Sequence, residues 1–222
     1  MKKIVVFAAA LLSSANLFSQ KIKVDESSES LGGGSNNAFV VTIYDAKPDD
    51  IEREWRSMMK DWNAKTDKKD GGVFGDNAKI AAINGNNTID IYAKAEQKKD
   101  NEVKFMVAFD LGGAFLSSSK QGSEAKEAKK IVYDFAVKMT KEAIAGQLKA
   151  AEKILEKKND ERKDLEKDKE KLEKNIAEWK EKIKKAEDDI VKNKSDQETK
   201  KGEIEVQKKV VEEIQKKEKA VD

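Results

Sequence analysis

The sequence predicts an α+β fold: a small antiparallel sheet with two helices on one face, the second helix continuing into a long coiled-coil-like helical stalk. Two observations predict it. Between residues 38 and 116, apolar side chains alternate with polar ones in short runs, as in strands with one buried face. From Ile144 onward, apolar side chains recur at alternating intervals of four and three residues. Because 40% of the 222 residues are charged, part of the chain is expected to lie outside any core.

Residues 1–19 have the layout of a secretory signal peptide. Lys2 and Lys3 precede a short apolar run from Ile4 to Leu12, and small polar residues follow. The apolar run is too short for a permanent membrane anchor, so no transmembrane span is expected after signal removal. We therefore expect an exported protein, periplasmic or secreted, that begins at Gln20. Residues 20–37, rich in Ser, Gly and charge, are predicted to form a flexible leader.

The composition excludes several classes of function. The chain has no cysteine and no histidine, so disulfides and the commonest metal and general-base side chain are absent. Without Lys2 and Lys3, the 45 basic residues become 43, which equals the 43 acidic residues. This balance lacks the basic excess that nucleic-acid binding requires, so no nucleic-acid partner is expected.

Residues 38–143 are predicted to form the α+β head. A strand around residues 39–44 is followed by a helix that begins at Pro48, and two further alternating runs occupy residues 88–96 and 103–111. A second helix begins near Glu124. The side chains expected to face the core are Phe39, Val41, Ile43, Ile51, Trp55, Met58, Trp62, Ile89, Ile91, Ala93, Ala95, Val103, Phe105, Val107, Phe109, Leu111, Ile131, Phe135 and Met139.

The opposite face of the predicted sheet carries a candidate contact surface. Tyr44, Tyr92 and Met106 each follow a residue that is expected to be buried, so alternation places them on the other face. Exposed aromatic and flexible apolar side chains are typical of protein or ligand contact. The same face could also be covered by the chain's own stalk.

Residues 144–222 are predicted to form the stalk, and its apolar positions form a narrow stripe that we call the seam. The large seam residues are Leu148, Leu155, Leu165, Leu172, Ile176, Trp179, Ile183, Ile190, Ile204, Val211 and Ile214. Long helices in water need a packing partner, so the seam predicts either a protein partner or self-association.

Two topologies for the stalk stay open at this point. Residues 192–203 carry no apolar side chain and contain Ser195, Asp196 and Gly202, so a break near 193–202 could fold the stalk into an intrachain hairpin. Against a turn, the seam keeps its phase through this window. A long self-associating helix is the alternative.

No catalytic residue, cofactor site or metal site is predicted. Asp70 and Asp76 flank glycines, but their spacing does not match a calcium-binding loop. The composition and seam predict a non-enzymatic structural or interaction protein of the bacterial cell envelope, with a head for contact and a stalk for assembly. A head that binds a small apolar ligand between sheet and helices is the main alternative, and a hydrolase that uses carboxylates is a more distant one.

Overall fold

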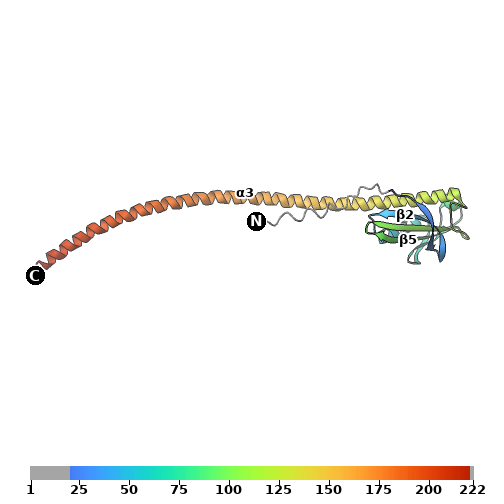
Figure 1. The fold of residues 1–222 in the computed structure, drawn as a ribbon, viewed down its shortest axis with the longest axis horizontal. Coiled ribbons are helices and arrows are strands. Elements are labelled where there is room, and N and C mark those ends of the chain that lie inside the picture. Colours follow the sequence, from blue (N-terminus) through green and yellow to red (C-terminus); the bar gives the residue numbers. More distant parts are fainter. Residues whose placement is uncertain (1–20, 221–222) are drawn as a thin grey trace. The chain divides into compact units, whose positions relative to one another are not determined.

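The computed structural model describes residues 21–220, which contain six strands and three helices (Figure 1). The strands are β1 (Asp25–Leu31), β2 (Gly34–Tyr44), β3 (Lys65–Lys69), β4 (Gly72–Ala78), β5 (Ile89–Lys99) and β6 (Glu102–Asp110). The helices are α1 (Pro48–Asp61), α2 (Ala81–Asn84) and α3 (Gly122–Lys219). The chain forms two compact units: the head unit ends at Ala151, and the stalk unit begins at Glu152.

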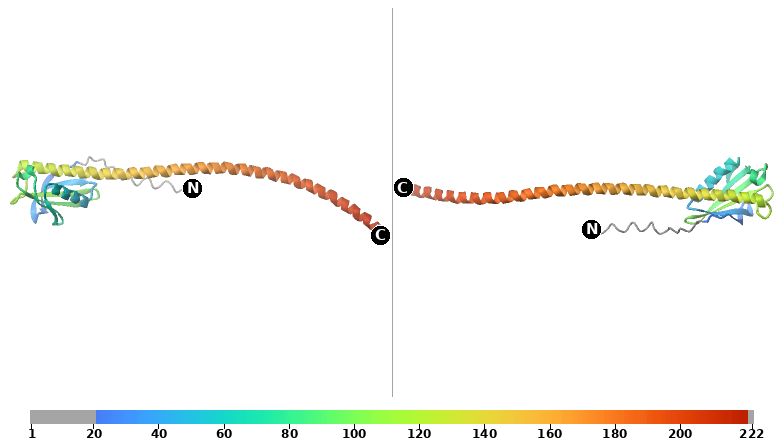
Figure 2. Two further views of the ribbon diagram at one scale, coloured as in Figure 1. Left: turned by 180° about the vertical axis from the view of Figure 1, so that it is seen from behind. Right: turned by 90° about the horizontal axis from the view of Figure 1, so that it is seen from above.

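The strands form one antiparallel sheet in the order β1-β2-β6-β5-β4-β3. The predicted α+β class, with two helices on one face of the sheet and the second helix continuing far beyond it, is confirmed. Figure 2 shows α1 and the first turns of α3 beside the sheet. The sheet has more strands than the sequence predicted, because β1, β3 and β4 are short or polar.

The main core lies between one sheet face and these helices, and it contains the residues that alternation placed inward. Trp55 of α1 is fully buried, and its ring packs edge-on against Phe105 of β6 and Phe135 of α3, with centroid distances of 5.2 and 4.9 Å. Strand alternation brings Phe39, Val41 and Ile43 to the same cluster. Side chains therefore fill the space in which the alternative hypothesis placed a small apolar ligand.

The prediction of a flexible leader over residues 20–37 is wrong for its larger part. Residues 25–31 form β1, and β2 begins at Gly34 rather than near residue 38. β1 lies at the edge of the sheet and has only one apolar side chain, Leu31, so its composition gave no strand signal.

The β1–β2 turn explains why the glycines follow Leu31. Leu31 pairs with Gly34, so Gly32 and Gly33 form a two-residue hairpin loop with φ values of +65° and +79°. Two positive φ values in such a loop are the signature of the tight turn that matches strand twist, and glycine adopts them without strain.

Of the two topologies left open for the stalk, the structure has the continuous helix, because α3 runs from Gly122 to Lys219 without the possible break near 193–202. Side chains in this window support the helix locally. Gln197 Nε2 donates to Asn193 Oδ1 at 2.7 Å, and Lys201 Nζ pairs with Glu198 Oε1 at 2.6 Å. Within residues 21–220, no helix combines the length and hydropathy needed to cross a membrane.

Candidate interaction surfaces

Of the three predicted contact residues, Tyr92 packs against the cluster that contains Met106, whereas Tyr44 lies apart from both. Met106 is only 3% exposed, so it is a core residue rather than a contact residue. Tyr44 pairs with Glu102 of β6, whereas Tyr92 pairs with Ala108, six residues further along the strand. That separation corresponds to roughly 20 Å at about 3.3 Å per residue.

The β1–β2 hairpin accounts for the burial of Met106. Residues 34–38 of β2 do not pair with β6, and the end of the hairpin lies over the sheet face opposite the helices, where Lys104 Nζ of β6 contacts Glu29 Oε2 of β1 at 2.8 Å. Leu31 and Ala38 from the hairpin form a second apolar cluster with Met106 and Ala108. The alternating pattern correctly placed Met106 on the sheet face opposite the helices. The hairpin that covers this face comes from the segment that was predicted to be flexible.

Beside this cluster lies a half-buried aromatic surface, which we define as Phe74, Tyr92 and Phe115. The ring centroids of Phe74 and Tyr92 are 4.9 Å apart, and those of Tyr92 and Phe115 are 6.1 Å apart. Only Tyr92 was predicted here. Phe74 lies in a glycine-rich run without clear alternation, and Phe115 follows two glycines after β6, so neither carried a strand signal.

A cation lies over the aromatic surface. Lys69 Nζ is 4.7 Å from the ring centroid of Phe74 and 5.3 Å from that of Tyr92. Such contacts are worth about 0.5–1 kcal/mol at exposed sites. Aromatic side chains are enriched at protein contact sites.

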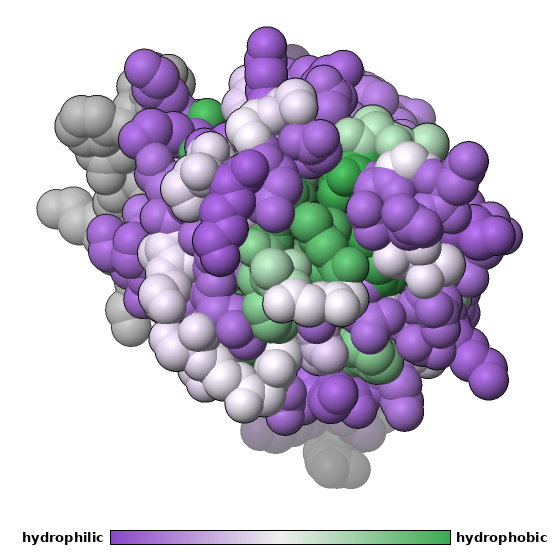
Figure 3. Space-filling view, turned by 90° about the vertical axis from the view of Figure 1, so that its right-hand side faces the viewer, coloured by the Kyte–Doolittle hydropathy of each residue, from purple (hydrophilic) through white to green (hydrophobic). Residues whose placement is uncertain are grey.

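The head also shows apolar side chains at the end that faces right in Figure 1. Seen from that side, a recessed apolar area is surrounded by hydrophilic side chains (Figure 3).

Gly32 holds the hairpin turn against the aromatic surface, and a matched pair of substitutions tests this. A Cβ at Gly32 would lie 2.8 Å from Phe115 Cζ, whereas a Cβ at Gly33 would have no neighbour within 4 Å. Because both positions have positive φ, Gly32→Ala and Gly33→Ala carry similar backbone strain, about 1 kcal/mol. We expect Gly32→Ala to lower the free energy of unfolding of the head by about 1–3 kcal/mol more than Gly33→Ala in chemical denaturation. Equal losses would contradict this packing.

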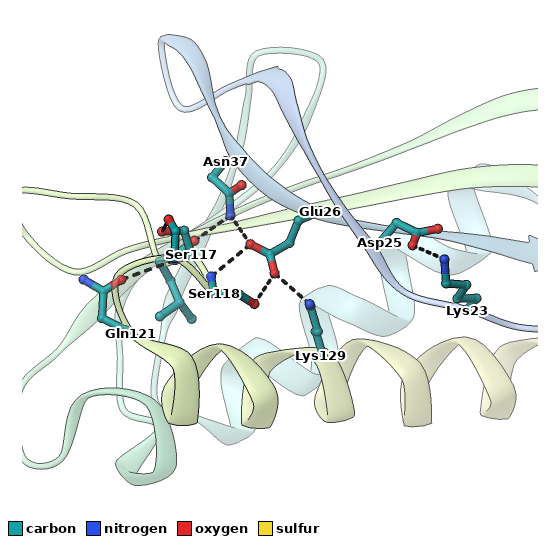
Figure 4. Close-up of polar contacts among 10 residues, drawn as sticks. Lys23, Asp25, Glu26, Asn37, Ser117, Ser118, Gln121 and Lys129 are labelled. Carbon is teal, nitrogen blue, oxygen red and sulfur yellow. Dashed lines mark hydrogen bonds and ion pairs between the residues drawn. The ribbon is translucent and has the colours of Figure 1, made fainter.

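A partly buried carboxylate ties the hairpin to the rest of the head (Figure 4). Glu26 of β1 accepts hydrogen bonds from Asn37 Nδ2 at 3.1 Å, from the Ser118 backbone N–H at 3.0 Å and from the Ser118 hydroxyl. Lys129 Nζ of α3 lies 2.8 Å from its Oε1. Burial raises the pKa of Glu26, but hydrogen bonds from Lys129, Ser118 and Asn37 together outweigh burial and lower the pKa from 4.5 to about 2.

The lowered pKa predicts a pH-dependent stability. Because the folded state favours ionised Glu26, its contribution is complete above pH 4.5 and is lost as the pH falls towards about 2. Glu26→Gln should therefore destabilise the head at pH 7 by up to about 3 kcal/mol, and the difference from the parent should shrink below pH 4. Denaturation followed by near-ultraviolet circular dichroism measures it, with Asp100→Asn in an exposed turn as control. A pH-independent difference would contradict this role.

The seam residues of the stalk are exposed throughout. Relative exposure runs from 44% at Val211 to 70% at Leu165. The predicted seam residues in this range are Leu148, Leu155, Leu165, Leu172, Ile176, Trp179, Ile183, Ile190, Ile204, Val211 and Ile214. Large apolar side chains at regular spacing along one helix are typical of an interaction surface rather than of a solvated helix.

Within residues 21–220, no group of three or more Asp, Glu, His or Cys side chains is placed to hold a metal ion. Asp70 and Asp76 lie near opposite ends of β4, which spans Gly72–Ala78. Three carboxylates in the head have a lowered pKa. Glu26 and Glu29 contact lysines and fix the hairpin, whereas Glu124 accepts hydrogen bonds from its own backbone N–H and from the Ser123 hydroxyl.

The sequence matches no family of known proteins, no curated protein and no solved structure.

Proposed function

We propose that this is an exported, non-enzymatic structural or interaction protein of the bacterial cell envelope. The stalk mediates assembly, and the head makes further contacts through its aromatic surface. The observation that carries the proposal is the seam, whose large apolar side chains are all 44% exposed or more along one continuous helix.

Helix energetics support the need for a partner. Ion pairs such as Lys169–Glu173 and Lys208–Glu205 stabilise the stalk helix, but each exposed pair contributes only about 0.3–0.5 kcal/mol. Burying a leucine or isoleucine contributes about 1.5–3 kcal/mol. Association along the seam is therefore the larger source of stability for residues 152–219.

Thermal melting of the full chain tests assembly. If association stabilises the stalk, its helical signal should melt at a higher temperature as protein concentration rises over an about 100-fold range. Circular dichroism at 222 nm follows the stalk, because α3 contributes most of the helix. A melting temperature that is independent of concentration would contradict assembly through the seam.

Export is supported by the sequence of residues 1–19, which lie outside the described residues. Signal removal predicts a mature chain that begins at Gln20. The intact mass of protein recovered from the envelope fraction of expressing bacteria measures this. Full-length protein confined to the cytoplasm would contradict export.

A further inference from the structure

We infer that the occupant of the seam is a second copy of this chain, aligned in parallel and in register. This inference rests on the proposed assembly through the stalk and adds the identity and direction of the partner. In a parallel pair, both head units are joined to the same end of the paired helices. Three features of residues 152–219 carry the inference.

The first feature is the choice of apolar side chains at the two seam positions. We label the seven positions of the repeat a to g, so that Leu155 occupies position a and Leu165 occupies position d. Position a then holds the β-branched residues Ile176, Ile183, Ile190, Ile204 and Val211. Position d holds Leu165 and Leu172, and further along the stalk it holds Trp179, Ala186, Asn193, Lys200, Gln207 and Ile214. β-branched residues at a with leucine at d favour two parallel strands over larger bundles.

The second feature is the charge on the two flanks of the seam. In a parallel, in-register pair, each g residue faces the e residue five positions later in the partner chain. From Lys182 onward, four consecutive pairs of this kind have opposite charges: Lys182 with Glu187, Asp189 with Lys194, Asp196 with Lys201, and Glu203 with Lys208. Each pair occurs twice in the dimer, so the C-terminal half of the stalk is complementary to its own copy.

An antiparallel pair lacks this complementarity on the g flank. In that arrangement g residues face g residues, and most charged g positions before Val210 are acidic: Glu161, Asp168, Asp189, Asp196 and Glu203, against Lys182 alone. The e residues would face one another too, and there Glu166 and Glu173 near one end could meet Lys194, Lys201 and Lys208 near the other. The preference for the parallel alignment therefore comes from the acidic g flank, on which like charges would oppose one another, and from the side chains at a and d.

The third feature explains the charged stretch of the seam. Arg162 and Lys169 occupy position a, and each already pairs with a carboxylate on the e flank of its own helix. Arg162 Nη1 lies 3.9 Å from Glu166 Oε1, and Lys169 Nζ lies 3.6 Å from Glu173 Oε1. Glu161 and Asp168 on the g flank are the acids available to the partner's basic seam residues. In the parallel pair Glu161 faces Glu166 of the other chain and Asp168 faces Glu173, so these two flanking pairs repel. The basic seam residues Arg162 and Lys169 lie between these acids and offset that repulsion.

Single cysteines test the alignment, since the chain has none of its own. Leu155→Cys and Val211→Cys each replace a position-a residue, near opposite ends of the stalk. Under a glutathione redox buffer at micromolar protein, both full-length variants should form self-linked dimers about tenfold or more above Lys174→Cys, whose side chain points away from the seam. Circular dichroism confirms that each variant keeps its helix.

The possible outcomes distinguish failure of the parallel alignment from failure of the proposed assembly. Efficient self-linking at both positions supports the parallel, in-register pair. Linking at one position or neither, in a protein whose mass in solution is that of a dimer, would overturn the alignment but leave assembly in place. Single-chain mass at all concentrations, with neither position above the control, would overturn both.

Discussion

Replacing Ile176 and Ile183 with Asp in the same chain should abolish association of the stalk. Both residues occupy the seam and are 48% and 58% exposed in the single chain, so their burial depends on a partner. A dimer would lose four buried side chains at about 2 kcal/mol each and would bring charges together in their place, which raises Kd by on the order of 10⁶-fold. Sedimentation equilibrium measures the association, and circular dichroism measures the accompanying loss of helix.

A matched control adds the same charge away from the seam. Ala177→Asp with Ser195→Asp also introduces two carboxylates into the stalk helix, at exposed positions outside the seam. This variant should associate within about threefold of the parent, since exposed substitutions usually change stability by about 0.5 kcal/mol or less. If the two double variants behaved alike, the seam would not be the site of association.

Inverting the lysines on the e flank should weaken the dimer through charge alone. Lys194→Glu, Lys201→Glu and Lys208→Glu together convert six facing pairs in a parallel dimer from attraction to repulsion. At about 0.5 kcal/mol per pair, the loss is about 3 kcal/mol, or roughly a 100-fold rise in Kd at low salt. The same charge change at outward positions, made by Lys185→Glu, Lys192→Glu and Lys209→Glu, should have a much smaller effect.

Mixing with a complementary variant completes this test. A chain carrying Asp189→Lys, Asp196→Lys and Glu203→Lys has basic residues on both flanks, so it should repel its own copy and pair with the lysine-inverted chain. Sedimentation of the mixture should show heterodimers at concentrations where each variant alone is largely monomeric. Absence of heterodimers would contradict pairing between the g and e flanks.

Local patterns were sufficient to predict the main core and the helical seam. Alternation identified Phe39, Phe105 and Phe109 as buried, because one sheet face is fully covered by helices and the period of two is unbroken there. The seven-residue phase of the seam likewise indicated one long helix. Residues 193–202 suggested a turn because Ser, Asp and Gly are each common in turns. In the helix, polar side chains of this window contact one another and stabilise the helix.

The second face of the head could not be predicted from local patterns. Met106 is buried by Leu31, which lies 75 residues earlier in a polar edge strand. Glu26 contacts Ser118 and Lys129, which lie even further away along the chain. The Gly-Gly pair before Gly34 is a recognised hairpin signal, yet the charged residues of β1 obscured it. Phe74 and Phe115 joined the aromatic surface only through tertiary packing.

The molar mass of the chain from Gln20 in solution, measured by multi-angle light scattering after size exclusion, tests the central claim most directly. Scattering reports molar mass independently of molecular shape. Assembly through the seam predicts twice the mass of a single chain at micromolar concentration, and single-chain mass for the variant with Asp at positions 176 and 183. A parent protein that has single-chain mass across the accessible concentration range would contradict the account.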